Sequence, residues 1–281
     1  MPSQIHWFPG HMNKALHEVE ERVKLVDVVI ELLDARAPFS SINEQLEKLI
    51  ANKKKLIVLS KPDLADPNQT DKWKQYFIDK GNLTLVLNLT NPSANKEINA
   101  AINKLGQEKW AKQKAKGMKP QPIRTMILGI PNVGKSSLIN RIAKRSAAGV
   151  QNKPGYTRGE QWIKVNNDYL LLDTPGILPM NYDNQKKAAN LALLGAIRED
   201  ILPKNDLVDI LLKFLKDKYP HALKGRFDIE EIGEAKEVLE KISSKRGLLT
   251  NNGAVDYVKS ENLLLKEFKD GLLGRMTLEW L

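Results

Sequence analysis

The chain has 281 residues, of which 42% are hydrophobic and 28% charged, and its net charge is +10; this composition is typical of a globular protein with its own core rather than of a disordered chain. Cysteine is absent, which excludes a disulfide scaffold, a thiolate zinc site and cysteine catalysis. No apolar run near the first residues is long enough for a signal peptide or a membrane span, so we expect a cytoplasmic protein that does not enter a membrane.

Apolar runs and amphipathic patterns alternate through the first 180 residues. Strands are predicted at 25–33, 55–59, 84–89, 125–130 and 169–173. Helices between them are predicted at 43–51, 71–80, 95–116 and 135–144. This alternation is typical of an α/β fold with a doubly wound, mainly parallel sheet covered on both faces. Ligands bind such sheets at the carboxyl ends of the strands, so the residues that follow each strand are the candidates for function.

The strand signals fade after Pro179. Helices are predicted instead at 206–217, 231–243 and 256–269. We therefore expect two domains: an α/β domain over residues 1–180 and a smaller all-α C-terminal domain over residues 181–281.

Positive charge is concentrated in the middle of the chain. Residues 102–164 contain fourteen lysines and arginines but only two acidic residues, whereas residues 181–281 are neutral overall. Two interpretations stay open. The basic residues are either solvated helix faces around one phosphate-binding lysine, or a surface that binds a polyanion such as RNA.

The strongest motif is GIPNVGKS at residues 129–136, which matches GxxxxGK[ST] between a predicted strand and a predicted helix. Glycines let such a loop curl so that its N–H groups point at phosphate oxygens, and the helix presents its positive end to the same anion. The lysine contacts the β- and γ-phosphates, and the serine hydroxyl binds Mg²⁺. The candidate nucleotide-binding residues of this P-loop are Asn132, Val133, Gly134, Lys135, Ser136 and Ser137.

Two further segments complete the expected phosphate site. Residues 173–176 (DTPG) end the last predicted strand, where Asp173 would hold Mg²⁺ and the N–H of Gly176 would meet the γ-phosphate. Between the two motifs, the segment KPGYT places Thr157 where it could close over Mg²⁺ and the γ-phosphate. The expected metal ligands are therefore Ser136, Thr157 and Asp173.

A guanine-binding motif follows an earlier strand. Residues 60–63 (SKPD) fit [NTS]KxD, in which the carboxylate of Asp63 would accept hydrogen bonds from two guanine N–H groups and the stem of Lys61 would cover the ring. A polar turn after a strand is the alternative. Asn88, at the end of the next strand, begins a segment where a backbone N–H could meet guanine O6. The base motif precedes the phosphate motif, the reverse of the usual order, so the chain is predicted to be circularly permuted.

This order of motifs, with WFPGHM at 7–12 and LLDARAP at 32–38, resembles the circularly permuted YlqF-type GTPases. The resemblance covers residues 5–180 with specific motifs and the helical remainder more loosely. It implies hydrolysis of GTP to GDP and phosphate, coupled to late maturation of the large (50S) ribosomal subunit. The implied partners are rRNA, the large-subunit precursor and ribosomal proteins, and the implied state is a monomer. The resemblance also implies that Asn132 helps hold K⁺. One departure is Ser60, where asparagine or threonine is commoner.

The residue that orients the attacking water is not evident from the phosphate motifs. In Ras-like enzymes a glutamine follows the DxxG glycine, but this chain has Ile177 there, and isoleucine can neither donate nor accept a hydrogen bond. The resemblance points to His11 as the catalytic residue, and a histidine is chemically suited to the role. From chemistry alone, His11 could equally be a loop histidine or an RNA contact.

Other functions were weighed against a ribosome-assembly GTPase. The main alternative is an RNA-binding scaffold in which GTP is structural rather than a switch. A GTPase that serves membranes or signalling has no lipidation signal to support it, and Asp63 disfavours an ATPase. Because the DTPG segment leads directly into the predicted C-terminal domain, loss of the γ-phosphate is expected to move that domain.

Overall fold

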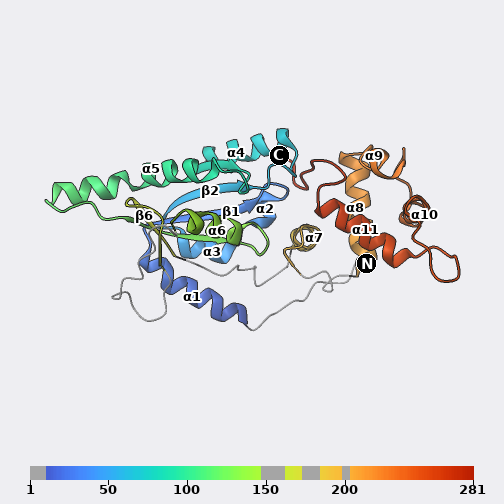
Figure 1. Ribbon diagram of the computed structural model, residues 1–281, viewed down its shortest axis with the longest axis horizontal. Coiled ribbons are helices and arrows are strands. Elements are labelled where there is room, and N and C mark those ends of the chain that lie inside the picture. Colours follow the sequence, from blue (N-terminus) through green and yellow to red (C-terminus); the bar gives the residue numbers. More distant parts are fainter. Residues whose placement is uncertain (1–10, 147–161, 173–183, 198–202) are drawn as a thin grey trace.

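Figure 1 shows the computed structural model, which describes residues 11–146, 162–172, 184–197 and 203–281. The side chains of residues 11–15 and 143–146 lie outside this description. Within the described residues, one sheet forms the centre of an α/β unit, and a group of helices forms a second lobe to the right of it in Figure 1.

The sheet has six strands in the described residues, in the order β3-β2-β1-β4-β6-β5. The strands are β1 Val28–Asp34, β2 Lys54–Ser60, β3 Leu83–Leu87, β4 Ile123–Gly129, β5 Trp162–Lys164 and β6 Tyr169–Leu172. All neighbouring pairs are parallel except β5 with β6. This confirms the predicted doubly wound, mainly parallel sheet. The edge strand β5 was not predicted, and β1 begins at Val28 rather than at residue 25, because Leu25 ends a helix.

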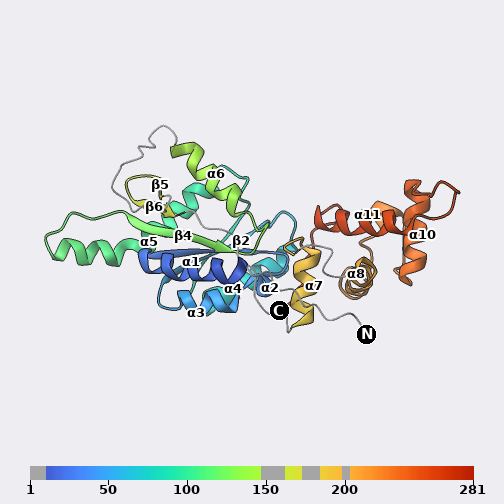
Figure 2. The same cartoon turned by 90° about the horizontal axis from the view of Figure 1, so that it is seen from below.

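Helices cover both faces of the sheet, so its central strands are mostly apolar; every residue of β1 is buried, including Glu31 and Asp34. In Figure 2, α1 and α3 lie below the sheet and α6 lies above it. The helices of this unit are α1 His11–Leu25, α2 Pro38–Ser41, α3 Glu44–Ile50, α4 Pro67–Asp79, α5 Ala94–Ala115 and α6 Lys135–Ser146. The last four were predicted with boundaries shifted by a few residues; α1 and α2 were not predicted.

The second lobe is helical, as predicted for the region after residue 180. Its helices are α7 Gln185–Leu193, α8 Lys204–Lys218, α9 Lys224–Phe227, α10 Ala235–Arg246 and α11 Tyr257–Lys269. Helices α7 and α9 were not predicted, and α10 begins four residues later than expected. None of the helices in the described residues is long and apolar enough to cross a bilayer.

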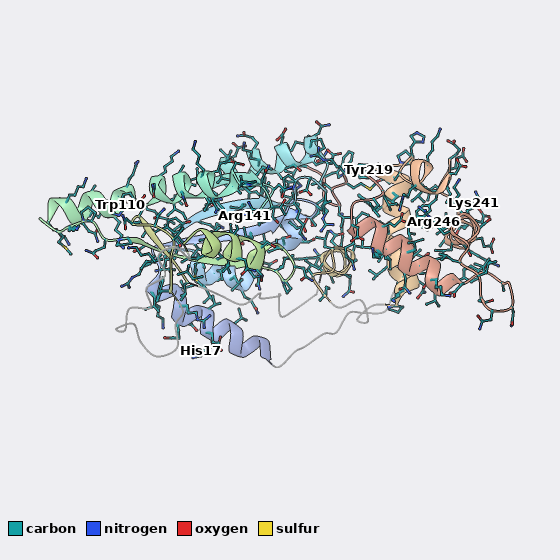
Figure 3. The ribbon with its side chains drawn as sticks, viewed as in Figure 1. His17, Trp110, Arg141, Tyr219, Lys241 and Arg246 are labelled. Carbon is teal, nitrogen blue, oxygen red and sulfur yellow. The ribbon has the colours of Figure 1, made fainter. Side chains whose placement is uncertain are left out.

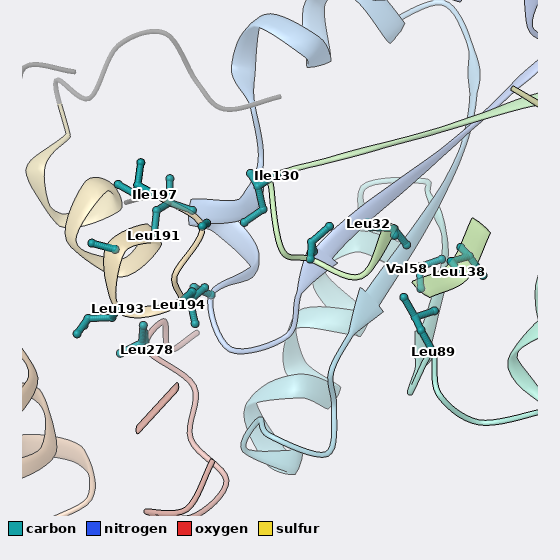
Figure 4. Close-up of a cluster of buried hydrophobic side chains, with 14 of the residues drawn as sticks. Leu32, Val58, Leu89, Ile130, Leu138, Leu191, Leu193, Leu194, Ile197 and Leu278 are labelled. Atoms are coloured by element: carbon teal, nitrogen blue, oxygen red, sulfur yellow. The ribbon is translucent and has the colours of Figure 1, made fainter. Parts of the chain in front are cut away.

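The hydrophobic core is continuous from the sheet to the second lobe. Figure 4 shows Leu32, Val58 and Leu138 on the sheet side of this core, and Leu191 of α7 with Leu278 on the side of the second lobe. All five side chains are fully or almost fully buried. The segment after α11 therefore does not stay with its own lobe. It returns to the sheet, and Figure 1 places the end of the chain beside α4.

Candidate functional site

Three loops leave the same edge of the sheet. In the parallel register, Leu32 on β1 pairs with Gly129 at the end of β4, and Asp34 pairs with Ser60 at the end of β2. Ser60 in turn pairs with Leu87 at the end of β3. The phosphate loop (residues 129–136), the base loop (residues 61–66) and the turn after β3 are thus brought to one carboxyl edge, where ligands bind in such sheets.

The phosphate loop requires both of its glycines. Gly129 has φ +155°, and a Cβ there would lie 2.6 Å from the carbonyl oxygen of Leu32. Gly134 has φ +108°, and a Cβ there would lie 2.9 Å from Cδ1 of Leu89. Asn132, at φ 59°, also adopts the left-handed region, which asparagine tolerates better than most residues. The loop is therefore curled and closely packed against β1 and the turn after β3 before any ligand binds.

Lys135 is a buried cation at the start of α6. Its Nζ donates to the carbonyl oxygens of Gly129 (3.1 Å) and Ile130 (2.7 Å). Burial lowers the pKa of its ammonium to about 8. No carboxylate pairs with it in the described part of the chain. A buried ammonium held by carbonyls alone is suited to receive an anion, and this observation fits a triphosphate.

Other phosphate-loop residues differ in exposure. Val133 is buried beneath the loop, whereas Ser136 and Ser137 are exposed on the first turn of α6. The two hydroxyls are therefore accessible to phosphate and Mg²⁺, and Val133 contributes its backbone.

Ser60 joins the base motif to the phosphate loop. Its side chain is fully buried, and its Oγ lies 2.8 Å from the carbonyl oxygen of Val133 and 3.1 Å from that of Leu33. A serine hydroxyl has one hydrogen, which these two acceptors share. The serine that departs from the commoner asparagine or threonine thus makes a direct link between the two halves of the site.

The base loop begins with a strained residue and presents a free carboxylate. Lys61 has φ 55°, and its Nζ donates to Oδ2 of Asp34 at 3.0 Å. Asp63 is exposed, and no hydrogen bond or ion pair occupies its carboxylate among the residues that the structure describes. Both of its oxygens therefore remain available to a ligand.

Asp34 anchors an ionic cluster behind the base loop that the motif search did not assign. Arg36 donates to both oxygens of Asp34, from Nε at 3.0 Å and from NH2 at 2.9 Å. Both side chains are about 3% exposed or less. Burial alone would raise the pKa of Asp34, but Arg36 and then Lys61 lower it to about 2. The sequence indicated only part of this cluster: Asp34 ends an apolar run at the same edge as the other motifs, whereas its pairing with Lys61 follows from the packed fold.

The turn after β3 closes on itself. The side-chain oxygen of Asn88 accepts from the backbone N–H of Thr90 (2.9 Å) and from its hydroxyl (2.6 Å). Arg141 of α6, labelled in Figure 3, donates to the carbonyl oxygen of Thr90. Asn88 therefore holds the turn in shape, and a hollow of about 330 Å³ lies beside it between Leu89 and α6.

Several known proteins that are similar to this chain are ribosome-related GTPases by name. The sequence profile described as 50S ribosome-binding GTPase matches residues 124–249. Ribosome biogenesis GTPase A of Bacillus cereus is 45% identical, over 98% of this chain and 93% of that protein. The protein of the same name in Bacillus licheniformis is 43% identical, over 98% of both. The chain belongs to the ribosome biogenesis GTPase A family. It is therefore a GTPase.

A solved structure of similar shape agrees with this family. The crystal structure of GNP-bound YlqF from T. maritima has 26% sequence identity and a TM-score of 0.68, and the match covers 95% of this chain and 98% of that one. The matching profile starts at residue 124, in β4, and leaves the SKPD motif upstream. This position is consistent with the predicted circular permutation of the family.

The phosphate loop also touches the second lobe of this family member. The side-chain Nδ2 of Asn132 donates to the carbonyl oxygen of Gly195, at 2.6 Å. The donor is the amide nitrogen, whereas K⁺ would be bound by the amide oxygen. The turn after α7 thus contacts the phosphate loop directly.

Several predicted residues lie outside the described residues. They are Thr157, Asp173, Gly176 and Ile177. His11 is described only as the first residue of α1, without its side chain. Their predicted roles stay predictions.

Proposed function

We propose that this GTPase is an assembly factor that binds rRNA and the precursor of the 50S ribosomal subunit and acts late in the maturation of that subunit. Its relatives are named ribosome biogenesis GTPase, and the matching profile is described as 50S ribosome-binding GTPase. We further propose a cytoplasmic monomer that contacts ribosomal proteins, with residues 1–180 as the GTPase domain and residues 181–281 as its helical partner.

The observation that carries the proposal is the meeting of the phosphate and base loops. Buried Lys135 lacks an anionic partner in the described residues, and Ser60 ties the phosphate loop to the loop that bears Asp63. In the proposed complex, Lys135 and the loop N–H groups hold the phosphates, and Asp63 accepts hydrogen bonds from guanine while the stem of Lys61 covers its ring.

The oxygen-bearing side chains expected around the phosphates are of the kind that binds Mg²⁺ and K⁺. Mg²⁺ would be held by the hydroxyl of Ser136 with Thr157 and Asp173, and it would neutralise charge on the transferred phosphate. Hydroxyl and carboxylate oxygens are the ligands that Mg²⁺ prefers. K⁺ would take the amide oxygen of Asn132. Gly176 would meet the γ-phosphate, and His11 would orient the attacking water.

A basic surface on α5 is the proposed RNA contact. Lys112, Lys114, Lys116 and Lys119 are exposed along the last turns of α5 and just beyond it, where Figure 1 shows the helix extending past the sheet. A hollow of about 400 Å³ along the C-terminal half of this helix is lined by four lysines and by Asp27 and Glu108, which pair with three of them. Exposed lysines at this spacing are suited to neutralise successive phosphates of a nucleic acid.

The RNA proposal is tested by comparing two triple variants. We expect Lys114→Ala, Lys116→Ala and Lys119→Ala together to weaken binding to 50S precursors and to reduce the salt dependence of RNA binding. Lys236→Ala, Lys241→Ala and Lys245→Ala together are the matched control, because these exposed lysines of α10 lie in the second lobe (Figure 3). Equal RNA binding by both variants would refute the α5 surface.

The assembly role is tested in cells and with purified particles. Depletion of the protein is expected to accumulate an immature large subunit on sedimentation, and 50S particles are expected to accelerate GTP hydrolysis. Normal ribosomal particles after depletion would refute the proposed role in maturation of the 50S subunit. Equal RNA affinity with GDP and with a nonhydrolysable GTP analogue would favour the scaffold instead.

A further inference from the structure

The segment after α11 supplies hydrogen bonds that the base loop cannot make for itself. Arg275 donates from Nε to the carbonyl oxygen of Ala65 (2.9 Å) and from NH2 to that of Pro62 (2.8 Å). The backbone N–H of Met276 donates to the carbonyl oxygen of Leu64 at 3.0 Å. The carbonyls of Pro62, Leu64 and Ala65, which lie on both sides of Asp63, are thus bound by a segment more than 200 residues away in the sequence.

The next residue of the segment extends this contact to the end of the loop. The backbone N–H of Asp66 donates to Oγ1 of Thr277 at 3.1 Å. The backbone N–H of Thr277 donates to the hydroxyl oxygen of Tyr219 (3.1 Å), and that hydroxyl donates to Oδ2 of Asp66 (3.2 Å). Tyr219 ends α8, on the side of the second lobe that faces the sheet in Figure 3. The base loop is therefore bridged to that lobe.

The segment that makes these bonds is itself firmly held. Residues 276–279 are buried although they form no helix or strand. The N–H of Leu278 donates to the carbonyl oxygen of Arg36 at 2.7 Å. The carboxylate of Glu279 accepts from the backbone N–H groups of Phe39 (2.7 Å) and Ser40 (2.9 Å) at the start of α2. A segment anchored on the turn after β1 and on the start of α2 can impose a fixed geometry on the loop it contacts.

The guanidinium of Arg275 bonds the backbone on both sides of Asp63, the residue proposed to recognise guanine. Asp63 lies between Pro62 and Leu64, whose carbonyls are held from the segment, whereas its own carboxylate is unbound. The loop also starts at Lys61 with φ 55°, a conformation that persists in a non-glycine residue only when its surroundings enforce it. Holding the peptide groups on both sides fixes the direction of the Asp63 side chain, and two hydrogen bonds to one base require that direction.

We propose that Arg275 is a positioning residue for guanine recognition, which holds the base loop so that Asp63 accepts from both N1–H and the 2-amino group of guanine. The proposal rests on the proposed role of Asp63. It makes the segment after α11 part of the nucleotide specificity of the enzyme through its contacts with the backbone of the base loop.

Inosine triphosphate (ITP) provides the decisive probe, because inosine lacks the 2-amino group. We expect Arg275→Ala to weaken GTP binding about tenfold and to reduce the preference for GTP over ITP at least about threefold. The value of kcat at saturating GTP should stay near wild type, because the phosphate loop is held by other contacts. Arg275→Lys, which keeps one charged donor, should recover part of the preference.

The matched control is Arg246→Ala, an arginine of the same lobe that stacks on Phe227 and does not contact the base loop. It should leave the GTP-to-ITP ratio unchanged. If Arg275→Ala folds poorly, Thr277→Val removes the acceptor for Asp66 with little change of shape, and it should shift the ratio in the same direction.

Equal losses of GTP and ITP affinity in Arg275→Ala, or a lower melting temperature with an unchanged ratio, would reduce Arg275 to a structural role and overturn the proposal. A wild-type protein that binds GTP but shows no preference over ITP would instead refute the role of Asp63 itself. The two failures are therefore distinguished by the wild-type measurement.

Discussion

The two loops of the nucleotide site are built in different ways. The cation of the phosphate loop is held locally: Lys135 donates to the carbonyls of Gly129 and Ile130, six and five residues away. The base loop is held from a distance, by Asp34 on one side and by Arg275 on the other. One half of the site is therefore specified by a short motif, and the other half depends on the whole fold. Substitutions far from the base loop in the sequence, such as at Arg275, should affect base recognition and leave phosphate binding unchanged.

The largest effect on GTP binding is expected at the local half. Lys135→Ala should weaken GTP binding at least about 100-fold, about 3 kcal/mol, because it removes the buried cation that meets the phosphates. Its melting temperature should stay the same or rise, since burial disfavours the ammonium and lowers its pKa. Equilibrium GTP binding and thermal unfolding measure the two quantities. Lys96→Ala, at an exposed lysine of α5, is the control, and equal GTP affinities of the two variants would contradict this assignment.

A second substitution removes the charge of Asp34, which holds the base loop through Lys61. Asp34→Asn should lower the free energy of unfolding by about 3–5 kcal/mol, because it leaves the buried guanidinium of Arg36 without its counter-charge. The pKa of Asp34, lowered to about 2, means that its stabilisation is present above about pH 4 and is lost as the pH falls towards 2. Urea unfolding at pH 7 measures the loss.

The control for this substitution is Asp79→Asn, at an exposed carboxylate at the end of α4. That variant should unfold at the wild-type urea concentration. If Asp34→Asn did the same, the ionic cluster would not support the base loop.

A smaller effect is expected at the link between the two halves. Ser60→Ala removes the hydrogen bond to Val133 and should cost about 1 kcal/mol of stability, with a GTP affinity reduced by about a factor of five. Ser93→Ala, at an exposed serine whose hydroxyl makes no capping bond, should change neither. Lower stability with unchanged GTP affinity would show that the two loops act independently.

A pH-dependent effect is expected in the sheet that carries both loops. Burial raises the pKa of Glu31, on β1, to about 8, although the ammonium of Lys55, 3.3 Å away, lowers it. The folded protein therefore keeps a proton that the unfolded chain releases near pH 4.5. That contribution to stability is present below pH 4.5 and is lost as the pH rises to about 8. Relative to wild type, Glu31→Gln should therefore become more stable as the pH rises from 5 to 8.

Denaturant unfolding at several pH values measures this trend. The control is Glu108→Gln, at an exposed carboxylate whose pKa Lys112 and then Lys54 lower to about 2. Its difference from wild type should stay constant over the same pH range. A parallel pH dependence of Glu31→Gln and wild type would mean that Glu31 is charged in the fold.

The sequence was informative wherever the signal is local. The five apolar runs located five strands, and the motifs after them mark the edge where the loops meet. The short strand β5 was missed because it has three residues and none of them is buried. Helix α7 was missed because residues 187–193 are all buried, so that no polar face produces a helical period.

The long-range contacts that hold the base loop could not be predicted from local sequence patterns. Arg275 and Pro62 are 213 positions apart, and nothing in the residues around Arg275 indicates a partner. The cluster of Asp34, Arg36 and Lys61 likewise depends on the pairing of β1 with β2. Contacts of this kind follow from the packed fold rather than from any short motif.

The most direct test of the guanine site is to change the base specificity from guanine to xanthine by substituting Asp63. Xanthine carries a carbonyl where guanine carries its 2-amino group, so an amide side chain can donate to it while a carboxylate cannot. With Mg²⁺ present, wild-type protein should bind GTP and reject both ATP and xanthosine triphosphate. Asp63→Asn should lose GTP affinity about 100-fold and prefer xanthosine triphosphate. An Asp63→Asn protein that still binds GTP as wild type does, with no gain for xanthosine triphosphate, would contradict the account.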